Sequence, residues 1–371
     1  MRSNSHWNAR PNRLAGLSQA DWAWQTRRMR HLLLAAAAAS LVLPAYAEEP
    51  APIPSPGEIA AAAPAKDWIA IAASDLLVMD LAADAKGKPR RVVIQLMPAP
   101  FSQGWIGNIR KLAAAHWWDG TSVNRVQDNY VVQWGDATEK KALPPGLATV
   151  PESEYETQPP SKIAALFDMS LAEAAFEDFN FKGDRKVVIG EGPEGGSFRE
   201  QTIEFPIVGG DSYSRSAGHW SGWQYATNFE KVWPVHCYGM VGVGRNMSPD
   251  TGSGAELYAV IGHAPRHLDR NIAVVGRVIS GIEHLSSLPR GTGALGFYED
   301  EGERVPIRSI RLATELPVAV QPKFEYLSTD SDSFSRYADA RQNRRDPFFV
   351  KPAGGADICN IPVPIRPVAA K

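Results

Sequence analysis

Short apolar runs separated by glycine- and proline-rich connections are the feature that most constrains how this chain can fold. Glycine (31) and proline (29) make up about one in six of its 371 residues, so short strands and long connections are expected. No helical pattern alternates with the runs, as it would in βαβ units. This order predicts an antiparallel barrel or sandwich rather than a doubly wound sheet. The predicted strands are 67–81 (one or two strands), 90–100, 121–126, 130–133, 239–245, 256–262, 272–279 and 306–313.

Two helices are predicted among these strands. The first follows Ser102, a residue type that can cap a helix N-terminus, and carries Ile106, Ile109 and Leu112 at helical spacing. The second is a short helix over 280–288. Elsewhere the pattern indicates a helix-like run at 161–179, a Gly/Ser-rich loop at 209–223 and a helix at 336–345.

The N-terminus has the pattern of a secretory signal peptide. Basic residues at 27–30 precede an apolar run over 32–43, and an A-x-A sequence follows at 45–47. The run is too short to span a bilayer. The alternative is a buried helix of a cytoplasmic protein. We expect export, cleavage after Ala47, a periplasmic or secreted mature chain, and no stable membrane span after cleavage.

Composition also predicts the boundaries of the chain's parts. Residues 1–47 are interpreted as an N-terminal extension with the signal peptide, and 48–66 as a Pro/Ala-rich linker. Residues 316–371 are proline-rich and are interpreted as a C-terminal extension.

Charge and cysteine content limit the class of function. The formal net charge is −2, and no basic stripe with interleaved aromatic residues is present, so we expect no nucleic-acid partner. The only cysteines are Cys237 and Cys359. In an exported chain they can form a disulfide, because disulfides persist in oxidising compartments. Two buried thiols are the alternative, and the sequence leaves both open.

Several motifs suggest chemistry but lack the context it needs. The sequence 291-GTGALG-296 does not open a helix within a βαβ unit, so it is interpreted as a flexible loop. His263 and His267 have the spacing of helical metal ligands, but Pro265 lies between them and would break the helix. No G-x-S-x-G sequence is present. We therefore expect no metal and no cofactor.

Polar residues within predicted strands are the remaining signal. Arg125 and Gln133 lie among Val and Tyr in 121-TSVNRVQDNYVVQWGD-136. Taken alone, this pattern also fits an edge strand with exposed polar side chains.

Three segments together resemble a cyclophilin-type peptidyl-prolyl cis-trans isomerase. Residues 92–136 are similar to the first half of that family, with Asn108 in the helix and an arginine followed by an aromatic, an aliphatic and a glutamine. Residues 239–262 resemble the segment that leads into the family's central strand, and 264–281 resemble its leucine-aspartate loop and the next strand.

The resemblance implies an all-β fold with two helices: a closed eight-stranded antiparallel barrel capped by the helices. The cyclophilin-like domain would cover 67–315, with an insertion at about 137–233, and 316–371 would be an added tail. The insertion and tail would pack outside the barrel or partly gate its groove.

The resemblance also implies an isomerase of X-Pro bonds in exported proteins. Arg125 would stabilise the twisted amide and Gln133 would brace its guanidinium. The partners would be proline-containing peptides and unfolded exported proteins, and the chain would be a monomer. The implied substrate-binding residues are Tyr130, Val131, Asn246, Glu256, Tyr258, His267 and Leu268.

Departures from the family pattern keep other functions open. Val131 stands where the family has methionine, Glu256 where it has glutamine, and Tyr258 where it has phenylalanine; Ile272 stands where it often has His or Tyr. One alternative is a cyclophilin-like chaperone or peptide-binding module with weak or no catalysis. Another is an unrelated exported β-rich hydrolase that uses acid and histidine residues.

Overall fold

The computed structural model describes residues 52–165, 187–189, 199–201 and 211–368. The predicted signal peptide and its cleavage site lie outside the described residues, as does most of the helix-like run at 161–179. Within the described part, no helix has the length and apolar character needed to cross a bilayer.

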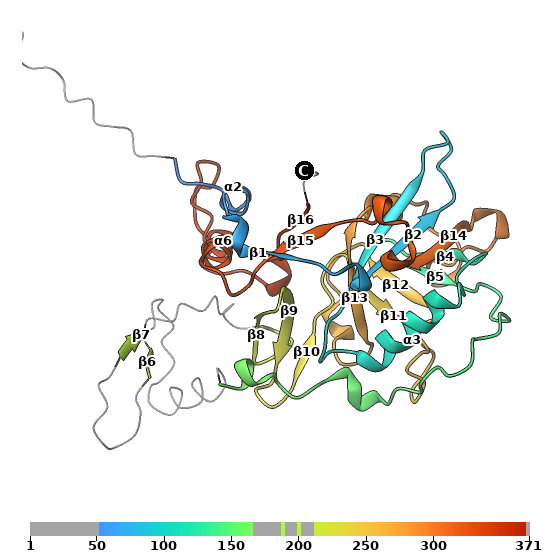
Figure 1. Cartoon of the computed structure of the whole chain (residues 1–371), viewed down its shortest axis with the longest axis horizontal. Helices are drawn as coiled ribbons and strands as arrows, with labels where there is room; N and C mark the ends of the chain where they lie inside the picture. The colour runs from blue at the N-terminus through green and yellow to red at the C-terminus, as the bar shows by residue number, and fades with distance from the viewer. Residues whose placement is uncertain (1–51, 166–186, 190–198, 202–210, 369–371) are drawn as a thin grey trace, which may run out of the picture. The chain divides into compact units, whose positions relative to one another are not determined.

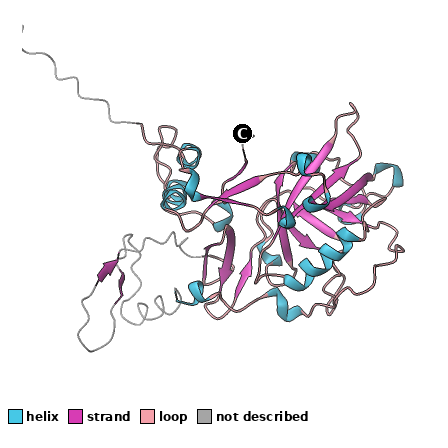
Figure 2. Cartoon of the chain, viewed as in Figure 1, coloured by secondary structure: helices cyan, strands magenta, loops and turns pink. Residues whose placement is uncertain are grey.

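Eight strands form a closed antiparallel barrel (Figures 1 and 2). Their order around the barrel is β11-β12-β5-β4-β14-β2-β3-β13, and β13 pairs with β11 to close it. Each strand overlaps a predicted apolar run, and the predicted closed eight-stranded fold is confirmed. The strands are β2 (Leu76–Leu81), β3 (Arg90–Leu96), β4 (Ser122–Val126), β5 (Val131–Gly135), β11 (Met240–Val243), β12 (Leu257–Val260), β13 (Val274–Ser280) and β14 (Val305–Leu312).

Both predicted helices pack against the barrel. Helix α3 (Gln103–Ala114) contacts β14, and the single turn α5 (Glu283–Ser286) contacts β3. Side chains of α3 such as Trp105 are fully buried, so one face of the helix completes the core. The indole Nε1 of Trp105 donates to the carbonyl oxygens of Thr251 and Gly252, each at 3.1 Å, which joins the helix to the loop before β12.

Ser102 does not cap α3 in the predicted way. Its backbone has a φ of 54°, and its side chain makes no capping hydrogen bond. The hydroxyl instead donates to the carbonyl oxygen of Val274 at 2.7 Å, because the residue is buried against β13. The prediction of a helix was right, but the proposed cap was wrong.

The insertion contains regular structure that the sequence pattern did not indicate. Strands β8 (Ser216–Trp220), β9 (Trp223–Thr227) and β10 (Val232–Pro234) form a three-stranded antiparallel sheet. Part of the loop predicted at 209–223 is therefore a hairpin, whose turn at Ser221 and Gly222 has positive φ at both residues. Strands β6 (Val187–Ile189) and β7 (Arg199–Gln201) form a separate pair.

The described part of the predicted linker forms a helix. In α2 (Pro56–Ala61), the Ser55 hydroxyl and the Glu58 carboxylate make a capping box, and Pro56 occupies the first turn. Helix α2 lies beside α6 (Asp332–Gln342) of the C-terminal segment (Figure 1). The S-x-x-E sequence at Ser55–Glu58 is typical of a helix N-terminus, but the Pro/Ala composition favoured the interpretation as a linker.

The two ends of the described chain also share a sheet. Strand β1 (Trp68–Ala70) pairs with β15 (Phe324–Leu327), which pairs with β16 (Ile365–Pro367). Residues 68–70, predicted as part of the barrel domain, therefore pair with the C-terminal segment instead.

A disulfide joins the barrel segment to the C-terminal segment. The Cys237 and Cys359 sulfurs are 2.00 Å apart, which resolves the choice that the sequence left open. Cys237 lies just before β11, so the bridge anchors the tail beside a barrel strand.

Replacing Cys237 and Cys359 together by serine should lower the free energy of unfolding by about 3–5 kcal/mol, because a bridge over a long loop restricts the unfolded chain. Urea denaturation under non-reducing conditions measures the difference, and reduced wild-type protein is the control that should match the variant. Equal midpoints for the oxidised wild type and the variant would contradict the expectation.

Candidate active site

A row of paired residues crosses four neighbouring barrel strands. Arg125 on β4 is the partner of Gln133 on β5, and Gln133 is the partner of Tyr258 on β12. Tyr258 is in turn paired with Gly242 on β11. A Cβ atom at Gly242 would lie 2.3 Å from the Tyr258 hydroxyl oxygen, so this glycine makes room for the tyrosine ring.

The Arg125 guanidinium is held by three acceptors. Its Nη1 donates to Gln133 Oε1 at 3.2 Å, and its Nε donates to the Leu295 carbonyl oxygen at 2.8 Å. Its Nη2 donates to Gln127 Oε1. A guanidinium has five N–H groups, so one on Nη1 and one on Nη2 have no acceptor among the described residues.

The environment of Arg125 is half-buried and partly aromatic. Its Cζ atom lies 5.9 Å from the ring centre of Tyr130 and 5.3 Å from that of Phe297. Burial lowers the pKa of Arg125 from its usual value, with the nearby Tyr130 and Tyr258 acting in the opposite direction. Arginine still remains protonated near neutral pH, so the site presents a fixed positive charge.

The glycine-rich segment 291–296 contributes to this site, although the sequence analysis interpreted it as a flexible loop. Leu295 supplies a carbonyl acceptor to Arg125, and Phe297 forms an isolated β-bridge with the same residue. Gln127, Leu295 and Phe297 were not predicted as site residues. Gln127 was visible two residues after Arg125, whereas the other two are about 170 residues away in sequence and carried no local signal.

Beside Arg125 lies a small apolar cluster, which we call the slot cluster. It consists of buried Val131, Tyr258 and Val260 with Tyr130 and Ile272 packed against them. Strands β5 and β12, the turn between β4 and β5, and the loop before β13 supply these residues. A charged donor group therefore borders an apolar surface against which a proline ring can pack.

The predicted residues His267 and Leu268 belong to the 3₁₀ turn Arg266–Leu268, which we call the rim turn. The exposed His267 ring stacks on Tyr130, with ring centres 6.4 Å apart and planes 9° apart. Leu268 is half-buried, and its carbonyl oxygen accepts from the backbone N–H groups of Asn271 and Ile272. The structure therefore brings His267 to the slot cluster through Tyr130.

Asn246 is exposed, and its backbone groups already have partners. Its N–H donates to Asp250 Oδ2 at 2.8 Å, and its carbonyl oxygen accepts from Arg245 Nη1 at 2.7 Å. The guanidinium of Arg245 also donates twice to the Asn271 carbonyl oxygen. A peptide that pairs with the Asn246 N–H must therefore displace Asp250.

Glu256 lies behind Gln133 rather than in the slot cluster. Its Oε1 accepts from the Asp136 N–H at 2.6 Å. Burial raises the pKa of Glu256, and hydrogen bonds from Asp136, Gln133 and Asn124 only partly offset this. A Cβ atom at Gly135 would lie 1.9 Å from Glu256 Oε1, so a glycine is required there for the carboxylate to approach β5.

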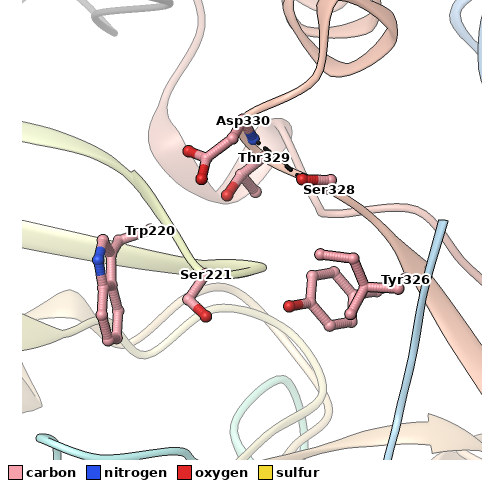
Figure 3. Close-up of a pocket in the computed structure, with 7 residues that line it drawn as sticks. Trp220, Ser221, Tyr326, Ser328, Thr329 and Asp330 are labelled. Atoms are coloured by element: carbon pink, nitrogen blue, oxygen red, sulfur yellow. Dashed lines mark hydrogen bonds between the residues drawn. The ribbon is translucent and has the colours of Figure 1, made fainter. Parts of the chain in front are cut away.

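Metal binding finds no support in the part of the chain that the structure describes, where no three His, Cys, Asp or Glu side chains gather to hold an ion. Figure 3 shows a small hollow elsewhere, between the β8–β9 turn and the loop after β15. There the Asp330 N–H donates to the Ser328 hydroxyl at 3.4 Å. This hollow includes none of the predicted site residues; it is lined by Ile69, Trp220, Ser221, Tyr326, Ser328, Thr329 and Asp330.

Comparison with known proteins gives a family match and a structural match. Residues 91–312 match the family model described as "Cyclophilin type peptidyl-prolyl cis-trans isomerase/CLD". No curated protein sequence matches the chain. The crystal structure of cyclophilin AquaCyp293 from Hirschia baltica aligns with a TM-score of 0.54 and 19% identity, over 82% of this chain and 94% of that chain. A cyclophilin type peptidyl-prolyl cis-trans isomerase from Cryptosporidium parvum, solved in the presence of the dipeptide Ala-Pro, has a TM-score of 0.31 and 10% identity, over 63% of this chain and 98% of that chain.

The family match covers more than half of the chain and includes the barrel strands β4, β5, β11, β12, β13 and β14. The first of these structures has the same fold, and the resemblance noted in the sequence is confirmed. The chain belongs to the family of cyclophilin-type peptidyl-prolyl cis-trans isomerases.

Proposed function

We propose that this enzyme isomerises X-Pro bonds of exported proteins and that Arg125 stabilises the twisted amide. The observation that carries the proposal is the Arg125 guanidinium, held by three acceptors with two N–H groups left beside the slot cluster. An isomerase of this kind needs no nucleophile, because no bond to the substrate is made or broken.

The mechanism follows from the electronic structure of the amide. Resonance gives the C–N bond a rotational barrier of about 18–20 kcal/mol. At the twisted geometry the resonance is lost, and the prolyl nitrogen gains a lone pair that can accept a hydrogen bond. A donor aimed at that nitrogen stabilises the transition state more than either planar isomer, and this difference is what lowers the barrier. Arg125 would be this donor.

The neighbours of Arg125 would keep the donor fixed before the substrate arrives. Gln133 Oε1 accepts one N–H from Arg125, so the Gln133 amide presents its oxygen to the guanidinium. Val131 and Tyr258 would hold the proline ring, and Tyr130 would close the slot between Arg125 and His267.

Two observations support export of the enzyme. The sequence at 27–47 has the charge, length and A-x-A pattern of a signal peptide. The Cys237–Cys359 disulfide suits a compartment such as the periplasm or the extracellular space, where such bonds persist. Its substrates would then be unfolded exported proteins that contain proline.

A peptide-binding or chaperone module with weak catalysis is the second candidate. The observation that favours it is Asn246, whose backbone N–H and carbonyl groups are both engaged within the protein. Isomerisation and suppression of aggregation, measured side by side on one unfolded proline-containing protein, distinguish the two functions.

Replacing Arg125 by alanine should lower isomerase activity about 10²- to 10³-fold, which is the usual effect of losing one preorganised donor. A protease-coupled assay on an X-Pro peptide measures it. Arg125→Lys is the matched control, since it keeps the charge but loses the forked donor geometry, and it should fall between the two. An alanine variant within twofold of the wild type, with an unchanged melting temperature, would remove the mechanism.

Replacing Glu256 by glutamine should raise the melting temperature at pH 7 relative to the wild type, with a smaller difference near pH 4. Burial raises the pKa of Glu256 in the folded protein. Its contribution to stability is therefore complete below the unfolded pKa and is lost as the pH rises through the folded pKa. Thermal unfolding of both proteins across this pH range measures the difference. A gap that widens toward low pH would contradict the assignment.

N-terminal sequencing of the exported protein should give a mature chain that begins at Glu48, because the A-x-A pattern ends at Ala47. Replacing Ala45 and Ala47 together by bulky residues is the control, and it should leave the exported chain uncleaved. A mature chain that starts before Glu48 would argue against this cleavage site.

A further inference from the structure

Behind the slot cluster lies a chain of buried polar side chains. The Tyr258 hydroxyl lies 2.9 Å from His236 Nε2, and His236 Nδ1 lies 2.9 Å from Asp269 Oδ1. Asp269 Oδ2 accepts from Arg266 Nε at 2.5 Å. Arg266 Nη2 then donates to Asp211 Oδ2 at 2.6 Å. The chain of contacts therefore runs from the slot cluster to a residue of the insertion.

The proton positions along this chain follow from its acceptors. Asp269 Oδ1 accepts from the backbone N–H of His236 as well as from the ring, so the ring proton of a neutral His236 lies on Nδ1. His236 Nε2 is then an acceptor, and the Tyr258 hydroxyl donates to it. The two rings are stacked, with centres 6.3 Å apart and planes 11° apart. Together with Gly242, this bond fixes how deeply the Tyr258 ring lies in the barrel wall.

Arg266 is the charged member of the chain and depends on its carboxylate partners. Its side chain is only 2% exposed. A charge buried to this extent needs partners of opposite charge, because an unpaired buried charge is strongly destabilising. Burial acts to lower the pKa of Arg266, but the carboxylates of Asp269 and Asp211 outweigh it and raise the pKa. Arg266 Nη1 has no hydrogen-bond acceptor among the described residues, and Asp357 Oδ2 lies 3.9 Å from it.

Asp211 is itself held in a defined position within the insertion. It accepts from the Tyr213 N–H at 3.0 Å and from the Ser214 hydroxyl at 2.8 Å. Burial would raise the pKa of Asp211, but the bonds from Arg266, Tyr213 and Ser214 lower it. The Tyr213 ring also lies 5.2 Å from the Arg266 guanidinium carbon. The insertion thus offers Arg266 an oriented, ionised acceptor.

Arg266 is also the first residue of the rim turn. His267 follows it and stacks on Tyr130, and Asp269 follows the turn and accepts from Arg266. A shift of Arg266 therefore moves His267 and Leu268 at the edge of the slot cluster. Through Asp269 and His236, the same shift reaches Tyr258 at its floor.

We propose that Asp211, Arg266 and Asp269 are positioning residues through which the insertion sets the affinity of the slot cluster for prolyl peptides. The proposal rests on the isomerase function proposed above. The catalytic donor is outside the chain of contacts, because Arg125 and Gln133 lie on β4 and β5 and are held by other acceptors. The insertion would therefore govern binding and leave the rate of the bound peptide nearly unchanged.

The experiment compares Asp211→Ala with the wild type. NMR titration with an Ala-Pro peptide gives the dissociation constant, and exchange spectroscopy at saturation gives the isomerisation rate. We expect the dissociation constant to rise about three- to thirtyfold, the range for residues that couple to a site without touching its ligand. The rate at saturation should stay within twofold. Asp211→Glu, which keeps the charge, should recover most of the affinity.

Gln95→Ala is the matched control. Gln95 Oε1 accepts from Nε and Nη2 of the buried Arg277, whose Nη1 donates to the Gly222 carbonyl oxygen in the insertion. This truncation also removes the acceptor of a buried arginine that joins barrel and insertion, but the hydrogen bonds of Arg277 go to Gln95 and Gly222 and not to the slot cluster. It should lower the melting temperature and leave the dissociation constant unchanged.

Two results would overturn the proposal: an Asp211→Ala variant that is less stable but binds the peptide within twofold of the wild type, or a control that weakens binding equally. If Asp211→Ala does not fold, the isosteric Asp211→Asn decides by the same criterion. Arg125→Ala, measured in parallel, separates the proposed isomerase mechanism from the proposed role of the insertion. Full activity of that variant would reject the proposed mechanism, whereas unchanged affinity of the Asp211 variants would reject only the role of the insertion.

Discussion

The pairing of β5 with β12 is the constraint on which the rest of the site depends. It joins the two halves of the chain across the insertion and sets Gln133 opposite Tyr258. Since Gln133 is also opposite Arg125, two antiparallel pairings bring Arg125, Gln133 and Tyr258 into a single row. Side chains alternate faces along a strand, so a slip of one residue at β12 would move Tyr258 to the other face of the barrel wall.

Two buried arginines connect the barrel to the insertion, and their different hydrogen-bond partners shift their pKa values in opposite directions. Arg277 has only amide and carbonyl acceptors, with its guanidinium carbon 4.1 Å from the Trp223 ring centre. Burial lowers the pKa of Arg277 to about 9. Arg266 is as deeply buried but faces two carboxylates, which raise its pKa. Both arginines bond to the insertion, yet only the Arg266 contacts continue to the slot cluster, so the two junctions have different consequences for binding.

The barrel was predictable because its strands carry local apolar patterns, and family resemblance then predicted Arg125, Gln133 and Tyr258 as site residues. Other features depend on contacts that no local pattern encodes. Leu295 reaches Arg125 from a distant loop through its backbone oxygen, to which any residue type could contribute. The pairing of β1 with β15 unites the ends of the described chain. The chain of contacts from Asp211 to Tyr258 likewise draws on four separate segments, and in sequence its members are ordinary polar residues.

The state of Asn246 explains why the slot cluster should dominate binding. A peptide that bonds to the Asn246 N–H gains that bond only by releasing Asp250, so the net gain is the difference between two hydrogen bonds. Asp250 keeps the Gly252 N–H as a donor and is exposed to water, so its release is possible at modest cost. Backbone anchoring then adds little affinity. Under the proposed function, burial of the proline ring against Val131 and Tyr258 displaces no protein hydrogen bond. The position of the Tyr258 ring, which the bond to His236 fixes, therefore matters more for affinity than the backbone of Asn246.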